Sequence, residues 1–215
     1  MSLSESLPLH GHAPALHDPG KRAFDLAALV LLLPIVLPLI AAICLLLLLS
    51  GGRPFYAQTR IGKGALPFRM WKFRSMVPDA DAALARLCAT DPALAVEWEQ
   101  NQKLHHDPRV TRLGRLLRRT SLDELPQLWN VARGDMSLVG PRPFMAEQED
   151  LYRAEGGRGY FRLRPGLTGL WQVSDRRRTE FSVRVKCDET YARTKSLLLD
   201  LRLIAATARA MTDGC

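Results

Sequence analysis

The sequence predicts an α/β chain, mostly helical with short strands, in which a re-entrant, broken apolar helix precedes one cytosolic domain. An uncharged run, Leu26–Leu49, contains two prolines four residues apart. Short segments of alternating character follow it, and most of the later chain has helical spacing. We therefore expect three parts: a disordered tail at 1–20, a membrane helix at 21–52 and a domain at 53–215.

The apolar run is long enough to cross a bilayer, which takes about 20 residues. Both of its flanks are basic, with Lys21 and Arg22 before it and Arg53, Arg60 and Lys63 after it. Since positive residues near a membrane segment prefer the cytoplasmic side, a re-entrant hairpin that turns near the prolines satisfies both ends. A kinked single span and a buried soluble helix are the alternatives. A cleaved signal peptide is not expected, because the run starts late and lacks a small-residue cleavage site.

The composition favours a partner rich in negative charge. The formal net charge is +8, which suits nucleic acid, anionic lipid headgroups or a phosphorylated substrate. The four cysteines lack CxxC spacing, so we do not expect a zinc site. We expect the cysteines to be reduced thiols.

Two short strands are predicted after the apolar run, at 54–58 and 67–75, with a turn at 62–64. Along the second strand a period of two places Lys72 and Arg74 on one face with apolar residues. These cations could reach an anionic ligand at the end of the strand, or simply extend to solvent from a half-buried strand.

Helical spacing then predicts two helices over Asp79–Leu104, broken near Asp91 and Pro92, in which no chemistry is visible. A further helix is expected over Ser196–Met211. Its apolar stripe packs into the core or lies on a membrane surface, and consists of Leu197, Leu201, Ile204, Ala208 and Met211, with Leu198 beside it.

The densest chemistry lies between Arg109 and Pro143. Three arginines on one helical face could contact nucleic acid, although no aromatic residues are interleaved with them. Ser121 and Glu124 have the spacing of a capping box, which predicts a helix that starts near Asp123. The positive field of that helix end would favour the ionised acids. An adjacent acid pair five residues after an arginine suits magnesium and phosphoryl chemistry.

Five segments together resemble the bacterial sugar transferase family, in the family's order, from Lys21 to the C-terminus. They are KRAFDL, FRMWKFRSM, DPRVTRLGRLLRRTSLDELPQLWNV, GDMSLVGPRP and RPGLTGLWQV. These proteins are monotopic polyprenyl-phosphate sugar-1-phosphate transferases, and the chain is most similar to their short, exopolysaccharide-initiating branch.

The resemblance implies a mechanism. Asp123 would attack the β-phosphate of a UDP-sugar and release UMP, and undecaprenyl or another polyprenyl phosphate would then take the sugar phosphate. Glu124, with Asp123, would hold Mg²⁺. The positions that match phosphate contacts are Arg118 and Arg142, with Lys72 and Arg74 as weaker candidates and Arg164 as a phosphate or uridine contact.

One departure concerns Ser174–Arg178, which reads SDRRR where the family often has an SGRN-like run, so sugar or nucleotide contacts in this loop stay open. Asp188, Tyr191 and Asp200 fit the family pattern and are assigned structural roles.

The resemblance also implies the partners: a UDP-hexose, polyprenyl phosphate and membrane lipid, but no nucleic acid. Galactose or glucose is the favoured hexose, and an N-acetylated sugar is an open alternative. A homodimer is also an open alternative. The implied location is the bacterial inner membrane, with the catalytic domain on the cytoplasmic face. The rival interpretations are an inactive membrane-anchored scaffold and a basic nucleic-acid-binding protein.

Overall fold

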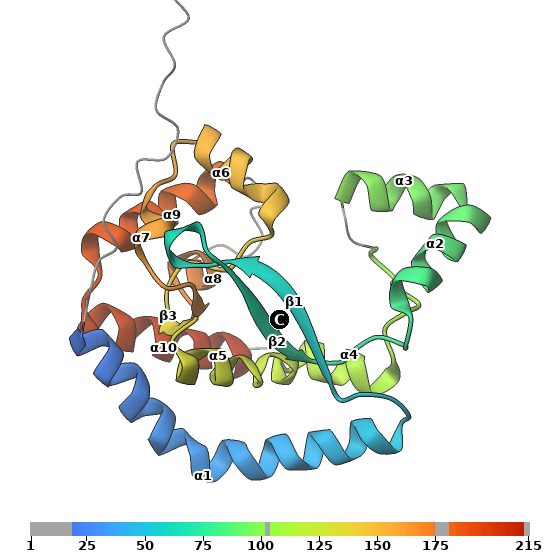
Figure 1. Ribbon diagram of the computed structural model, residues 1–215, viewed down its shortest axis with the longest axis horizontal. Helices are drawn as coiled ribbons and strands as arrows, with labels where there is room; N and C mark the ends of the chain where they lie inside the picture. Colours follow the sequence, from blue (N-terminus) through green and yellow to red (C-terminus); the bar gives the residue numbers. More distant parts are fainter. Residues whose placement is uncertain (1–18, 102–103, 175–180, 213–215) are drawn as a thin grey trace, which may run out of the picture. The chain divides into compact units, whose positions relative to one another are not determined.

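A computed structural model describes residues 19–101, 104–174 and 181–212 (Figure 1). The described chain is mostly helical with few short strands, as predicted. The predicted disordered tail, except for its last two residues, and most of the SDRRR run lie outside the described residues.

The α-helices are α1 (Pro19–Leu49), α2 (Ala80–Thr90), α3 (Pro92–Asn101), α4 (Arg112–Arg119), α5 (Gln127–Arg133), α6 (Glu149–Ala154), α7 (Gly159–Arg162), α8 (Leu170–Ser174), α9 (Phe181–Thr194) and α10 (Leu197–Thr212). The strands are β1 (Phe55–Ile61), β2 (Pro67–Phe73), β3 (Ser137–Val139) and β4 (Gly166–Thr168), and the 3₁₀ turns are η1 (Lys63–Ala65), η2 (Leu122–Glu124) and η3 (Ala146–Gln148).

The chain forms two compact units. The first contains the described residues up to Leu31, then Gln58–Met70 and the described chain from Leu128 on; the second contains Leu32–Ala57 and Trp71–Gln127. Each unit takes one part of α1 and of the paired strands β1 and β2. The border near residue 52 stays a prediction.

Helix α1 is continuous from Pro19 to Leu49, with both prolines inside it. Since proline has no N–H, the carbonyls of Val30 and Pro34 lose their usual donors four residues on. Within the described ranges, α1 is the one helix that is long and apolar enough to cross a membrane. Most of its apolar side chains are exposed, which does not fit a buried core helix. Its path through a bilayer stays a prediction.

The second unit packs the later part of α1 against β2 and α4. Ile43 and Leu47 of α1 form a buried cluster with Phe73 and Leu117. Helices α2 and α3 lie side by side and break at Asp91, as predicted (Figure 1).

The first unit is built on β3 and β4, which pair in parallel with Ser137 opposite Gly166 and Val139 opposite Thr168. Its aromatic core consists of Ile61, Phe144, Tyr152, Tyr160, Phe161 and Val185.

The structure corrects the predicted helix start near Asp123. Ser121 has a left-handed backbone (φ 55°) and its side chain caps nothing, so the capping box does not form. A 3₁₀ turn, η2, comes first, and the α-helix begins at Gln127, directly after Pro126. Asp123 and Glu124 therefore lie in a turn and not in the first turn of an α-helix.

The predicted core stripe of the last helix is also wrong. Leu197, Leu198 and Leu201 are each about half exposed (48%, 58% and 51%), whereas Asp200 and Leu203 are buried. The inward face of α10 is displaced because Asp200 has buried polar partners, described below. Its predicted place on a membrane stays a prediction, and the Met211 side chain lies outside the description.

Candidate functional site

The acidic pair lies in a tight turn of the second unit. After α4 ends, Ser121 turns the chain through its left-handed backbone, a conformation that is uncommon and costly for a residue other than glycine. The turn buries Asp123, which is 8% exposed, and leaves Glu124 partly exposed. Glu124 Oε1 lies 2.9 Å from Lys72 Nζ at the end of β2.

Arg118 reaches the same region from the last turn of α4. Its Nε donates to Ser75 Oγ at 2.8 Å, and Ser75 is itself buried. The Ser75 carbonyl accepts from Thr111 N at 3.1 Å. Gly114 makes this approach possible, because a Cβ there would lie 1.9 Å from the Ser75 carbonyl oxygen.

The electrostatics of Asp123 balance burial against these cations. Burial raises the pKa of Asp123, the positive charges of Lys72 and Arg118 act to lower it, and Glu124 adds to the rise. A buried carboxylate is poorly solvated, so its ionised form depends on nearby positive charge. The site thus contains a shielded carboxylate with two cations placed to stabilise its charged state.

The residues on either side of the acidic pair tie the turn to the apolar helix. Leu122 and Leu125 pack on the cluster that contains Ile43 and Leu47 of α1. The carboxylates are therefore fixed to the later part of α1, within a single unit.

Arg74 is used differently from the other predicted cations of this unit. Its Nη2 contacts the Leu47 carbonyl at 3.2 Å and Ser50 Oγ at 3.3 Å, at the C-terminal end of α1. Gly52 (φ 103°) leaves the space for this guanidinium, because a Cβ there would lie 1.8 Å from Arg74 Nη1. In this structure Arg74 satisfies helix-end groups, while Lys72 and Arg118 face the acids.

Arg142 and Arg164 belong to the first unit. Arg142 is partly exposed between buried Pro141 and Pro143. Arg164 donates from Nε to the Gly134 carbonyl at 2.8 Å and lines a small cavity that Lys63 and Lys195 also line. Burial, and then the charges of Arg164 and Lys195, lowers the pKa of Lys63.

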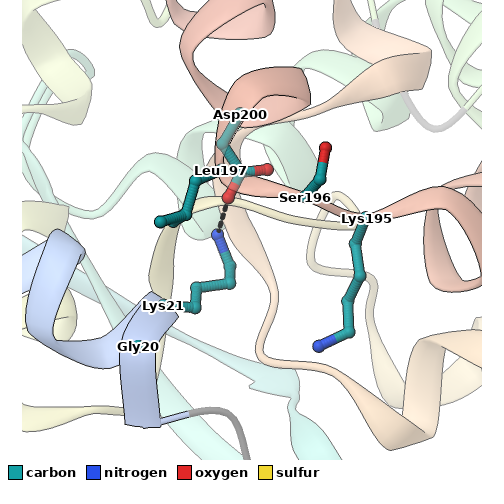
Figure 2. A pocket seen from close by; sticks show the side chains of 6 residues that line it. All are labelled: Gly20, Lys21, Lys195, Ser196, Leu197 and Asp200. Carbon is teal, nitrogen blue, oxygen red and sulfur yellow. Dashed lines mark hydrogen bonds and ion pairs between the residues drawn. The ribbon is translucent and has the colours of Figure 1, made fainter.

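The motif at the start of α1 has partners that the sequence did not indicate. Lys21 Nζ lies 2.5 Å from Asp200 Oδ2, beside a cavity lined by α1 and the start of α10 (Figure 2). Arg22 donates to the carbonyls of Val131 (2.5 Å) and Ala132 (2.8 Å), and Asp25 Oδ1 accepts from Leu138 N at 3.1 Å. Besides any role in topology, this motif holds the start of α1 to the first unit.

Asp200 has the structural role that was predicted, with Tyr191 as its second partner. Tyr191 donates to Asp200 Oδ1 at 2.7 Å and contacts the Val139 carbonyl at 3.2 Å. Arg184 was missed altogether, although it lies four residues before Asp188 on one helical face, a spacing that could have indicated an ion pair.

The donors available to a metal are few. No group of three or more His, Cys, Asp or Glu side chains in the described part of the chain could hold a metal ion. Mg²⁺ commonly takes one or two protein carboxylates and completes its shell with water and substrate phosphates. The adjacent carboxylates of Asp123 and Glu124 fit that pattern, provided that Glu124 exchanges Lys72 for the ion.

Comparison with known proteins gives one family. A family model described as bacterial sugar transferase matches residues 16–214. The chain is 42% identical over 187 residues to a UDP-galactose-lipid carrier transferase of Erwinia amylovora (87% of this chain, 39% of the relative). It is 41% identical over 189 residues to an undecaprenyl-phosphate galactose phosphotransferase of Salmonella typhimurium (88% of this chain, 40% of the relative).

A shorter relative is covered almost throughout. The exopolysaccharide production protein ExoY of Sinorhizobium fredii is 43% identical over 193 residues, which are 89% of this chain and 85% of the relative. The chain spans about two fifths of the first two relatives, with 39% and 40% of their lengths covered. Because the family model spans nearly the whole sequence and includes both the acidic turn and the segments around Arg142 and Arg164, this chain belongs to the bacterial sugar transferase family.

Proposed function

We propose that this protein transfers a hexose 1-phosphate from a UDP-sugar to a polyprenyl phosphate, namely undecaprenyl phosphate, and releases UMP. The product would start exopolysaccharide or related glycan synthesis. The relatives support this reaction, since their names include undecaprenyl-phosphate galactose phosphotransferase, a UDP-glucose:undecaprenyl-phosphate glucose-1-phosphate transferase and ExoY. Galactose or glucose is the proposed hexose.

The observation that carries the proposal is the placement of Asp123. Its carboxyl group is buried, it follows a strained turn, and Lys72 and Arg118 act on its charge. A carboxylate is a competent nucleophile toward phosphorus when it is ionised and sparingly hydrated. The two cations would also neutralise the oxygens of an incoming diphosphate.

The reaction would proceed in two displacements. A carboxylate oxygen of Asp123 bonds to the β-phosphorus as the bond from that phosphorus to the bridging oxygen breaks, and UMP leaves with the electron pair. A phosphate oxygen of the polyprenyl phosphate then bonds to the same phosphorus. The aspartyl oxygen departs, which restores the carboxylate and gives a polyprenyl diphosphosugar.

Glu124 and Lys72 would share in binding. Their ion pair in the absence of substrate holds both side chains beside Asp123. Bound Mg²⁺ would supply charge neutralisation of the diphosphate, with Asp123 and Glu124 as its protein ligands. Glu124 would orient the acceptor phosphate, and Lys72 and Arg118 would bind phosphate oxygens.

We also propose that α1 is a re-entrant anchor in the bacterial inner membrane, with the catalytic domain that follows it on the cytoplasmic face. Its exposed apolar surface, its prolines and its basic flanks support this topology. Leu122 and Leu125 pack on the cluster to which the later part of α1 contributes Ile43 and Leu47. The anchor would therefore hold Asp123 near the headgroups, where a soluble nucleotide sugar meets a lipid-bound phosphate.

The test measures the released nucleotide. Purified protein with UDP-galactose or UDP-glucose, Mg²⁺ and undecaprenyl phosphate should release UMP, and without the acceptor it should release a burst of about one UMP per enzyme. Asp123→Asn should lower the rate by about 10³-fold or more. The exposed Asp150→Asn is the matched control and should leave the rate unchanged. Release of UDP in place of UMP, or full activity of Asp123→Asn, would refute the proposal.

A further inference from the structure

The turn that carries Arg142 is fixed by backbone hydrogen bonds on both sides. Gly140 N donates to the Thr168 carbonyl at 2.9 Å, and the Pro141 carbonyl accepts from Gly166 N at 2.8 Å. Beyond Arg142, the Phe144 carbonyl accepts from Ile61 N at 3.0 Å. The prolines at 141 and 143 have no N–H, so few backbone groups remain to fix the centre of the turn from outside, and the Arg142 carbonyl is one of them.

Arg184 of α9 supplies that bond. Its Nη2 donates to the Arg142 carbonyl, and its side chain is buried, with the residue 7% exposed. Such burial of a guanidinium is costly unless its charge is compensated. The groups that compensate the charge of Arg184 therefore indicate its role.

Three aromatic rings and one carboxylate surround the guanidinium. Its carbon lies 5.3 Å from the centre of the Phe144 ring, 5.4 Å from Phe181 and 5.8 Å from Trp171. Ring faces attract a desolvated cation, and the planar guanidinium can contact several rings while it donates at its edge. A lysine ammonium lacks this shape.

Asp188, one helical turn after Arg184, supplies the opposite charge. Its Oδ2 lies 3.9 Å from Arg184 Nε and accepts from the Tyr152 hydroxyl of α6 at 3.3 Å. Glu189 on α9 is the other acid that acts on it. Burial raises the pKa of Asp188 to about 7, and the charge of Arg184 opposes that rise.

We propose that Arg184 is a positioning residue, held by Asp188, which itself accepts from Tyr152. Arg184 fixes the turn that carries Arg142, so that the Arg142 side chain is set to bind a phosphate group of the ligand. Arg184 does not touch the substrate itself. This inference rests on the proposed function for the identity of the ligand, but the fixing of the turn can be measured without catalysis.

The first test is a double-mutant cycle on UMP release with Arg184→Lys, Arg142→Gln and the double variant. If Arg184 acts through Arg142, Arg184→Lys lowers kcat/KM about tenfold or more in the wild-type background and has little further effect in the Arg142→Gln background. A purely structural role would give the same factor in both backgrounds. Equal factors, or an unchanged kcat/KM for Arg184→Lys, would overturn the inference.

The matched control is Arg153→Lys. Arg153 also lies over an aromatic ring, 4.0 Å from the centre of Phe161, but it is half exposed and pairs with Glu149. Its replacement should leave kcat/KM unchanged, and a loss equal to that of Arg184→Lys would overturn the inference.

Amide hydrogen exchange provides the readout that does not need activity. In Arg184→Lys, exchange should increase about tenfold or more in the peptide that spans Gly140–Phe144 and stay unchanged in α10. An unchanged exchange rate in the Gly140–Phe144 peptide would overturn the inference. If the wild-type protein releases no UMP, the proposed function fails, while the exchange result still decides whether Arg184 fixes the turn.

Asp188→Asn is a second test variant, because asparagine has nearly the same shape as aspartate but carries no charge. Because an ionised Asp188 holds Arg184 in place, wild-type kcat/KM should contain a component that rises with pH through about 7. This component should be absent from Asp188→Asn, and its persistence there would contradict the role assigned to Asp188.

Discussion

Gly114→Ala tests the close packing that holds Arg118 beside the acidic turn. The added Cβ would lie 1.9 Å from the Ser75 carbonyl oxygen and within 3.0 Å of two further Ser75 backbone atoms, whereas real Cβ contacts essentially never fall below 3.0 Å. Helix α4 and the chain at Ser75 must therefore separate by about 1 Å. A flexible side chain could move aside, but this neighbour is backbone.

The magnitude follows from two opposing effects. Overpacking of this kind costs about 1–3 kcal/mol, and the rigid neighbour favours the upper end. Alanine in place of glycine returns up to about 1 kcal/mol of helix propensity. The net loss of about 2 kcal/mol corresponds to a fall in Tm of roughly 4–8 °C for a chain of this size. UMP release should fall as well, because the bond from Arg118 to Ser75 is disturbed.

The assay is thermal unfolding of the purified protein in detergent, followed by circular dichroism. Arg112→Ala, an exposed change on the same helix, is the control and should alter stability by no more than about 0.5 kcal/mol. If Gly114→Ala unfolds at the wild-type temperature and keeps full activity, the close approach of α4 to Ser75 is refuted.

Two further predictions concern the charge on Asp123, the proposed nucleophile, and the path of α1 through the membrane. Lys72→Met should raise the pKa of Asp123 further, so the acidic limb of the pH profile for UMP release should move to higher pH. Lys72→Arg keeps the positive charge and should leave the acidic limb at its wild-type pH. If the limb does not move in Lys72→Met, Lys72 does not act on Asp123. In a cysteine-free background, Pro19→Cys and Arg53→Cys should both react with a membrane-impermeant thiol reagent from the cytoplasmic side, and labelling from opposite sides would establish a spanning helix.

The sequence by itself determined the family and several of the elements. Its local periods predicted the apolar helix, the two strands, the pair of helices that break at Asp91 and the final helix, because each pattern reflects neighbours a few residues apart. It also predicted the acid pair at Asp123 and Glu124 as catalytic residues, within the residues that the family model covers, and that role stays a prediction.

The tertiary structure decided which side chains meet. Lys72 and Glu124 pair across 52 positions of sequence, and Arg118 and Ser75 across 43, whereas Arg74, two residues from Lys72, is used at the end of α1. The motif of Lys21, Arg22 and Asp25 and the buried Arg184 likewise acquire their partners only in the fold. Such pairings, and the burial that raises the pKa of Asp123, depend on how distant segments pack, which no local period encodes.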